Sequence, residues 1–193
     1  MGHTRGSLEM LELGAFYKGK KVFLTGHSGF KGAWLALWLK EMGTTVTGFA
    51  LPPEDIRGNL FNLINLKDQI NSIACDIRDK EALEKAIKNC QPDMVFHLAA
   101  QPLVLTSYDD PVQTYDTNVM GTINVLECAR HTPSVKSIVV ITTDKCYENK
   151  EWVWAYRETD NLGGYDPYSS SKAMAELAAR SYYPSFFKVK GVG

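Results

Sequence analysis

Tyr168 and Lys172, in the stretch YSSSK, are the pair of residues whose types and spacing most clearly suggest chemistry. Four residues apart, they lie on the same face of any helix that contains them. A phenol is a poor base at neutral pH, but a neighbouring ammonium favours the phenolate form. The pair could therefore remove a proton from a hydroxyl group. Taken alone, a tyrosine and a lysine on the solvated face of a helix would give the same spacing.

A glycine-rich stretch within residues 20–42 predicts a place for an anionic ligand. Residues 22–24 form a short apolar strand pattern, Gly26, Gly29 and Gly32 follow, and a helical pattern begins. Glycines permit a tight turn and a close approach of the backbone to a pyrophosphate, and the N-terminus of the helix offers free N–H groups. The spacing is G-x-x-G-x-x-G and not the G-x-G-x-x-G fingerprint, so plain turn chemistry is the alternative.

Strand patterns and helix patterns alternate along the rest of the chain. Further strands are predicted at 44–50, 70–75, 94–98 and 137–142; helices at 80–89, at 111–130 and from about 168; and loops over 101–110 and around 152–156. Such alternation predicts parallel strands joined by right-handed crossovers. We therefore expect an α/β fold with a doubly wound, Rossmann-type parallel sheet, in the strand order 3-2-1-4-5.

Small or polar residues follow several of these strands, where open α/β sheets bind their ligands. Asp76 follows the third strand and could either cap the loop or contact an adenine ring. Ala99 and Ala100 follow the fourth strand, and residues 143–145 follow the fifth. The end of the second strand lacks the Asp or Glu that often holds ribose hydroxyls, so the pattern does not distinguish NAD from NADP.

Composition and charge exclude several classes of function. The 193 residues are 45% hydrophobic and carry a formal net charge of -1, which suits one globular domain and gives no electrostatic case for binding nucleic acid or an anionic membrane. No apolar segment approaches the roughly 18 residues that a membrane span needs. Four well-separated cysteines without a C-x-x-C pattern predict buried thiols in a reducing cytoplasm, with neither disulfides nor a metal site: Cys75, Cys90, Cys128 and Cys146.

Some residues are better explained without a ligand. Residues 1–9 resemble an expression-vector remnant, which leaves residues 10–193 as the dinucleotide-binding domain, with 10–19 as a lead-in segment. We expect His97 to be a packed core histidine. Trp34 and Trp38, four residues apart on the first helix, are expected to pack and not to bind.

Five motifs, in this order and spacing, carry a family resemblance: TGHSGFKG, HLAAQP, NVMGT, TTDKCY and YSSSKA. They resemble the extended short-chain dehydrogenase/reductase family of nucleotide-sugar enzymes, and GHSGFKGAWL and TTDKCYEN are most similar to its 4,6-dehydratases that act on CDP-glucose. The resemblance implies bound NAD, with NADP not excluded, a nucleotide-sugar substrate and a homo-oligomeric parent. Family members are considerably longer, so we expect the carboxyl-terminal sugar-nucleotide domain to be missing and one sheet edge to be exposed.

The resemblance also implies roles in a lyase cycle of oxidation at C4, elimination of water across C5 and C6, and hydride return to C6. Tyr168, assisted by Lys172, takes the proton of the C4 hydroxyl, and Thr143 hydrogen-bonds the same oxygen. Asp144 is the acid at the departing C6 hydroxyl. Either Lys145 or a water takes the C5 proton. Lys145 can do so only in its neutral form, which burial or a nearby cation would favour.

The same resemblance implies a cofactor site, in which Asn118 orders the active-site backbone. His27 and Lys31 are candidates for contacts with pyrophosphate or ribose, with a solvated Lys31 as the alternative. The alternatives for the chain as a whole are an epimerase or reductase of the same superfamily and a non-catalytic dinucleotide-binding fragment. The expected cofactor residues are Gly26, His27, Ser28, Gly29, Phe30, Lys31, Gly32, Asp76, Ile77, Leu98, Ala99, Ala100, Gln101, Asn118, Thr142, Tyr168 and Lys172.

Overall fold

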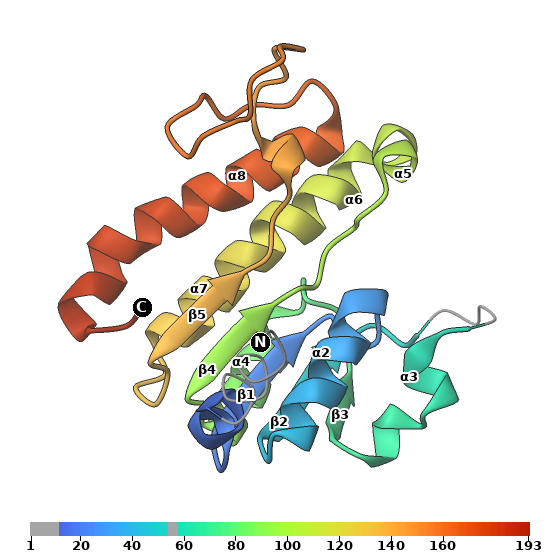
Figure 1. Ribbon diagram of the computed structural model, residues 1–193, viewed down its shortest axis with the longest axis vertical. Helices are drawn as coiled ribbons and strands as arrows, with labels where there is room; N and C mark the ends of the chain where they lie inside the picture. The colour runs from blue at the N-terminus through green and yellow to red at the C-terminus, as the bar shows by residue number, and fades with distance from the viewer. Residues whose placement is uncertain (1–11, 54–57) are drawn as a thin grey trace, which may run out of the picture.

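A computed structural model describes residues 12–53 and 58–193 (Figure 1). Helical residues at 12–17 lie within the expected lead-in segment, and the expected remnant at 1–9 lies outside the described residues. The elements that follow are β1 (Lys21–Thr25), α2 (Phe30–Glu41), β2 (Thr45–Ala50), α3 (Leu60–Leu63), the 3-10 turn η1 (Leu66–Asp68), β3 (Asn71–Ala74), α4 (Lys80–Cys90), β4 (Met94–His97), α5 (Val104–Asp109), α6 (Pro111–Tyr115), the π-helical turn η2 (Asp116–Met120), α7 (Gly121–Arg130), β5 (Ser137–Val140), the 3-10 turn η3 (Asp144–Cys146), α8 (Pro167–Tyr182) and the terminal turns η4 (Tyr183–Phe187) and η5 (Lys188–Lys190).

The five strands form one parallel sheet in the order β3-β2-β1-β4-β5, as predicted. In the centre of the sheet, Val22 of β1 pairs with Val46 of β2 and with Met94 of β4. Because all the strands run the same way, their carboxyl ends meet at one edge of the sheet. The residues that follow β1, β4 and β5 are therefore brought together.

The alternation of side chains along the strands builds a core on each face of the sheet. Val22 and Leu24 pack with Leu39 of α2 in one core, whereas Phe23 and Val95 face the other core with α4 and α7. Figure 1 shows α2 and α3 on one side of the sheet and α4 and α7 on the other. Both faces of β1 are covered, which is why its central residues are buried.

Trp34 and Trp38, which were expected to pack, are about half exposed. Their exposed fractions are 55% and 45%, whereas Ala33 and Ala36 of the same helix are buried. Helix α2 is apolar on more sides than the sheet can cover, so small residues face the strands and both tryptophans lie on the outside.

Two expectations about the segment 101–130 need correction. The expected loop at 101–110 contains the short helix α5, in which the hydroxyl of Ser107 donates to the carbonyl of Val104. The expected helix at 111–130 is present, but the π-helical turn η2 divides it into α6 and α7. Neither feature has a hydrophobic period of its own, because α5 is largely exposed and η2 lies between two regular segments.

Aspartate side chains cap the N-termini of α4 and α8. Asp79 accepts a hydrogen bond from the backbone N–H of Ala82 at 3.0 Å and caps α4. Leu83 and Ile87 in α4 are fully buried and form the face of this helix that packs on the sheet. Asp166 caps α8 in the same way, by accepting from the N–H of Ser169 at 2.9 Å.

The four cysteines are free thiols, but the expectation that all are buried holds for only two. Cys128 and Cys146 are buried, whereas Cys75 and Cys90 are partly exposed because they lie at the ends of β3 and α4. No helix in the described part of the chain is both long and apolar enough to span a bilayer.

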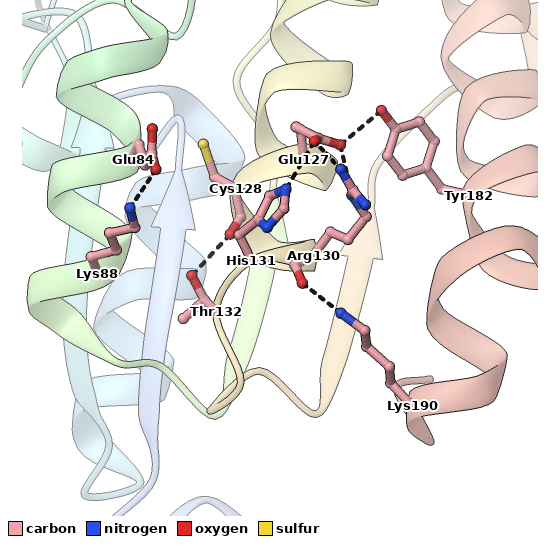
Figure 2. A network of polar contacts seen from close by, with 9 residues as sticks. All are labelled: Glu84, Lys88, Glu127, Cys128, Arg130, His131, Thr132, Tyr182 and Lys190. Atoms are coloured by element: carbon pink, nitrogen blue, oxygen red, sulfur yellow. Dashed lines mark hydrogen bonds and ion pairs between the residues drawn. The ribbon is translucent and has the colours of Figure 1, made fainter.

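A polar network joins α7 to α8 (Figure 2). Glu127 accepts hydrogen bonds from Arg130 at 2.9 Å and from the hydroxyl of Tyr182 at 3.3 Å. The Arg130 guanidinium is the main reason that the pKa of Glu127 is lowered to about 2. Lys190 adds a bond to the carbonyl of Arg130, so the turns after α8 are tied to the same network. This network helps to fix the helix that carries Tyr168.

The outer edge of β5 is partly paired. The N–H of Ile138 donates to the carbonyl of Gly193 at 2.8 Å, and the N–H of Gly193 donates to the carbonyl of Lys136 at 3.0 Å. These two bonds have the pattern of a parallel strand pair. The sheet edge that was expected to be exposed is therefore hydrogen-bonded at one position, to the backbone of Gly193.

Candidate active site

The glycine turn after β1 packs directly on the end of β4. Gly26 has a φ of 78°, and its N–H donates to the carbonyl of Phe49 at 2.9 Å. A Cβ at Gly26 would lie 2.7 Å from the nitrogen of Ala99 and 2.9 Å from the carbonyl carbon of Leu98. Only glycine fits this position, both for its backbone angle and for its space. The turn and the segment 98–101 thus lie side by side at the carboxyl edge of the sheet, where open α/β sheets bind ligands in a crevice.

The N-terminus of α2 is free of side-chain caps. Its N-cap is Gly29, with no side-chain hydrogen bond, and no acidic residue lies in the first turn. Phe30 and Lys31 of this turn are exposed. Because the first N–H groups of a helix lack intrahelical partners and carry partial positive charge, this end can hold an anion.

His27 and Ser28 of the turn point elsewhere. The His27 ring is buried, accepts or donates a 2.7 Å hydrogen bond with Ser72, and lies against Gly48, where a Cβ would come within 2.3 Å of the ring. Burial lowers the pKa of His27 to about 4. The hydroxyl of Ser28 donates to the carbonyl of Leu51. A ligand in the turn can therefore reach the backbone of His27 but not its ring.

Asn118 joins the segment after β4 to the start of α8. Its side-chain oxygen accepts from the N–H of Gln101 at 2.8 Å, and its amide nitrogen donates to the carbonyl of Gln101 at 3.1 Å. The same amide donates to the hydroxyl of Ser171 at 2.9 Å, and that hydroxyl donates to the carbonyl of Tyr168 at 2.7 Å. Asn118 lies in the π-helical turn η2 and is almost fully buried. It orders the backbone on two sides of the crevice.

Tyr168 and Lys172 lie one turn apart at the start of α8. Lys172 is only 7% exposed, and its ammonium donates to the carbonyl of Ile141 at 3.2 Å. Burial, with a smaller contribution from the positive charge of Lys31, lowers the pKa of Lys172 to about 8. Tyr168 is half-buried. The pair therefore lies beside the end of β5, and the bond to the Ile141 carbonyl holds the Lys172 ammonium in place.

Thr143, Asp144 and Lys145 form the chain after β5 and the turn η3, which packs against α8. The hydroxyl of Thr143 donates to the carboxylate of Asp144 at 3.0 Å and accepts from the N–H of Lys145 at 3.3 Å. Asp144 and Lys145 are exposed, and they do not form an ion pair with each other. Both side chains are therefore accessible from solvent.

Three of the expected cofactor residues have other contacts. Arg78 donates to the carboxylate of Asp76 at 2.7 Å, and this bond lowers the pKa of Asp76. Ile77 is buried in the core. The hydroxyl of Thr142 donates to Glu176, and both residues line a cavity of about 230 Å³ between β5 and α8. In this structure, the side chain of Thr142 therefore faces α8 and not the glycine turn.

Sequence reasoning missed three residues of the site. Thr25 and Thr122 are buried hydroxyls on either side of His97, and Ser171 links Asn118 to Tyr168. The motif YSSSK contains Ser171, and a serine inside a helix is a signal that its hydroxyl bonds to backbone or to a neighbour. No cluster of three or more His, Cys, Asp or Glu side chains among the described residues could hold a metal ion.

A parallel sheet in this strand order, with a glycine turn after its first strand and a Tyr-x-x-x-Lys pair in the helix after its fifth, defines a Rossmann-type protein of the short-chain dehydrogenase/reductase class. The model of one family of this class, described as GDP-mannose 4,6 dehydratase, matches residues 23–189. The chain belongs to this family.

Curated relatives of this chain are longer than the chain itself. The chain is 53% identical, over 89% of its length, to a CDP-glucose 4,6-dehydratase of Salmonella typhimurium, and it covers 48% of that protein. It is 33% identical to a CDP-paratose 2-epimerase of Salmonella typhi, over 84% of this chain and 52% of the relative. The chain thus spans about half the length of the curated relatives it matches.

A solved structure has the same fold. The UDP-glucose 4-epimerase of Thermus thermophilus, solved as a complex with NAD, matches with a TM-score of 0.73 and 28% identity, over 86% of this chain and 51% of that chain. The expected fold class, a Rossmann-type parallel sheet in the strand order 3-2-1-4-5, is therefore confirmed.

Proposed function

We propose that this chain is the dinucleotide-binding part of an NAD-dependent nucleotide-sugar 4,6-dehydratase, which converts CDP-glucose to CDP-4-keto-6-deoxyglucose. The observation that carries the proposal is the meeting of the start of α8, with Tyr168 and Lys172, and the turn η3, with Thr143, Asp144 and Lys145, at the carboxyl end of β5. The 53% identity to a protein named as a CDP-glucose 4,6-dehydratase supports the choice of substrate.

The residues of the crevice fit a dinucleotide. The space at Gly26 that a Cβ would fill lets the turn close on Ala99, and the uncapped N-terminus of α2 offers N–H groups to a pyrophosphate. Asp76 and the backbone of the segment 98–101 would hold the adenosine side, and Tyr168 and Lys172 would hold the nicotinamide side. Acceptance and return of hydride is the chemistry that NAD supplies when bound.

The chain's own residues account for the proton transfers at the sugar. Lys172 is mostly protonated at neutral pH, since its pKa is about 8. In the proposed cycle the base is the phenolate of Tyr168, which lies on the same helical face as this ammonium. That phenolate takes the proton of the C4 hydroxyl, while the Thr143 hydroxyl hydrogen-bonds the same oxygen. A ketone at C4 acidifies the hydrogen at C5. Asp144 then protonates the C6 hydroxyl as it leaves, and Lys145 or a water takes the C5 proton.

The proposal is tested with CDP-glucose, dTDP-glucose and NAD, and with the mass of the product as the readout. Dehydration removes one water, so we expect a product from CDP-glucose that is lighter than the substrate by that water. Tyr168→Phe should lower kcat by roughly 100-fold or more, while the Kd for NAD changes by less than about threefold. Tyr165→Phe is the matched control, because Tyr165 is 82% exposed on the same segment, and it should behave as the wild type.

An epimerase is the second candidate, and the 33% identity to a CDP-paratose 2-epimerase supports it. An epimerase returns a product of unchanged mass that keeps its C6 hydroxyl. Such a product would refute the dehydratase proposal. NAD binding with no turnover of either sugar nucleotide would instead favour a non-catalytic dinucleotide-binding fragment.

A further inference from the structure

A buried chain of hydrogen bonds runs through the centre of the sheet at His97. The ring nitrogen Nδ1 lies 2.7 Å from the hydroxyl of Thr25 at the end of β1, and Nε2 lies 3.0 Å from the hydroxyl of Thr122 in α7. All three side chains are at most 2% exposed. His97 thus links the end of one strand to a helix on the far side of β4.

The partners determine which nitrogen of the ring carries the proton. The single hydroxyl hydrogen of Thr122 points to the carbonyl of Asn118 at 2.7 Å, so Thr122 accepts from His97 and Nε2 must be the donor. Nδ1 is then the acceptor for the hydroxyl of Thr25. The other tautomer would leave the Asn118 carbonyl without this donor and would aim a third donor at the Thr25 oxygen.

Both ends of this chain reach the walls of the crevice. The Thr25 oxygen accepts from the N–H groups of Leu98 and Ala99, each at 3.1 Å, so it fixes the backbone on which the glycine turn packs. At the other end, the Asn118 carbonyl belongs to the residue whose side chain holds Gln101. With its proton on Nε2, His97 therefore donates to Thr122 and accepts from Thr25, and both hydroxyls bind backbone groups that shape the site.

We propose that His97 is a positioning residue, which as the neutral Nε2–H tautomer links the backbone of Leu98 and Ala99 to the π-helical turn at Asn118. The link holds the crevice in the shape that binds the dinucleotide, and in this respect it rests on the proposed function. Complete burial, with a smaller contribution from the Lys172 ammonium, lowers the pKa of His97 to about 3, so the ring is neutral at any physiological pH.

The tautomer is tested first, in the wild-type chain labelled with ¹⁵N at histidine. Two-bond correlations between ring protons and nitrogens distinguish a protonated Nε2 from a protonated Nδ1, and His97→Gln identifies the signals by removing them. We expect a protonated Nε2 and an unprotonated Nδ1 that do not change between about pH 5 and about pH 9. A protonated Nδ1, or a ring that titrates in this range, overturns the proposal.

Matched threonine variants in the same helical region test the link. Thr122 and Thr132 are both buried, and each hydroxyl donates to the carbonyl four residues earlier, which for Thr132 is that of Cys128 at 2.9 Å (Figure 2). Thr122→Val and Thr132→Val therefore remove the same local bond, but only Thr122→Val breaks the link to His97. A purely structural effect lowers the thermal stability of both variants alike.

The decisive readouts are amide hydrogen exchange at Gln101 and the Kd for NAD. We expect Thr122→Val to speed exchange at Gln101 and to weaken NAD binding by roughly tenfold, as the loss of one well-placed buried hydrogen bond implies, and Thr132→Val to stay within about twofold of the wild type. His97→Gln, which can still donate to Thr122, should bind NAD more tightly than His97→Leu.

The possible failures are distinguishable. Equal effects of the two threonine variants on exchange and on NAD affinity overturn the link, as does a His97→Leu variant that binds NAD as well as His97→Gln. Faster exchange in Thr122→Val with unchanged NAD affinity overturns its role at the crevice. A wild-type chain that binds no NAD refutes the proposed function, and the tautomer and exchange measurements then decide the link by themselves.

Discussion

Gly32→Ala is the substitution that most directly tests the packing of the glycine turn. A Cβ at position 32 would lie 2.0 Å from the carbonyl oxygen of Gly26, 2.7 Å from its carbonyl carbon and 2.9 Å from the Cα of His27. All three atoms are backbone, so no side chain can rotate away. Relief to an ordinary contact of 3.4 Å requires a shift of 1.4 Å, the difference between 3.4 and 2.0 Å, between α2 and the turn.

The cost follows from the usual penalties. Overpacking of this kind costs about 1–3 kcal/mol or more, and replacement of glycine by alanine in a helix returns about 1 kcal/mol. We expect a net loss of about 2 kcal/mol in the free energy of unfolding. For a chain of this size, that loss lowers Tm by about 4–8 °C. Thermal unfolding followed by circular dichroism measures it.

Gly29→Ala is the matched control within the same turn. Gly29 has a φ of -80°, and the nearest atom to an added Cβ is 3.4 Å away, so its stability should change by less than about 0.5 kcal/mol. Its open side faces the proposed pyrophosphate position, so NAD binding should weaken although the fold is intact. A Gly32→Ala variant that melts at the wild-type temperature would refute the close packing of α2 on the turn.

Three further substitutions test buried groups. Gly48→Ala would place a Cβ 2.3 Å from the ring of His27, so we expect the variant to unfold at lower urea concentration than the wild type, and an unchanged midpoint would contradict the packing. Folding lowers the pKa of Lys172 to about 8 from 10.5, so the native state binds fewer protons than the unfolded state between these values and wild-type stability rises with pH there. Lys172→Met should lack that rise, and in urea unfolding it should be more stable than the wild type near pH 7 by about 1–3 kcal/mol, although it loses turnover. If the stability of both proteins changes with pH in the same way, burial of the Lys172 ammonium does not cost stability. Folding lowers the pKa of Glu127 to about 2 from 4.5, so its contribution to folding stability is present above about pH 4.5 and is lost as pH falls towards 2. In Glu127→Gln, the loss of stability between these pH values should be smaller than in the wild type by about 1 kcal/mol. An unchanged loss would mean that other groups cause the acid sensitivity.

The fold could be predicted because the strands alternate regularly with helices. Five apolar runs separated by helical patterns determine a parallel sheet almost uniquely, and only the ends of the strands differ, since β5 ends at Val140 and not at Thr142. Exposure was harder to predict. Val139 of β5, which pairs with Phe96 of β4, and Ile141 after β5 are each 37% exposed. In Figure 1, no helix of the described residues lies in front of β5. A local pattern identifies an apolar face but not what packs on it.

The site could be predicted in part, and the limit is geometric. The spacing of Tyr168 and Lys172 places both residues on one helical face without knowledge of the fold. The direction of Thr142, in contrast, depends on how the chain leaves β5, and in the structure its hydroxyl bonds to Glu176. The His27 ring likewise belongs to the turn by sequence but to the core by packing, because Gly48 leaves room for it.

The π-helical turn at Asn118 explains why the most connected residue of the site has no strong local signal. Asparagine lowers helix propensity, and a regular helix would satisfy its backbone without help. Here the side chain of Asn118 makes three hydrogen bonds, and its carbonyl accepts the Thr122 hydroxyl. The three side-chain bonds join Asn118 to segments distant in sequence. A buried polar group left without its partner costs about 1–3 kcal/mol. The segments at 98–101, 116–122 and 168–171 are therefore held by bonds that stabilise one another, so the distortion of the helix at Asn118 is maintained by the same contacts that shape the crevice.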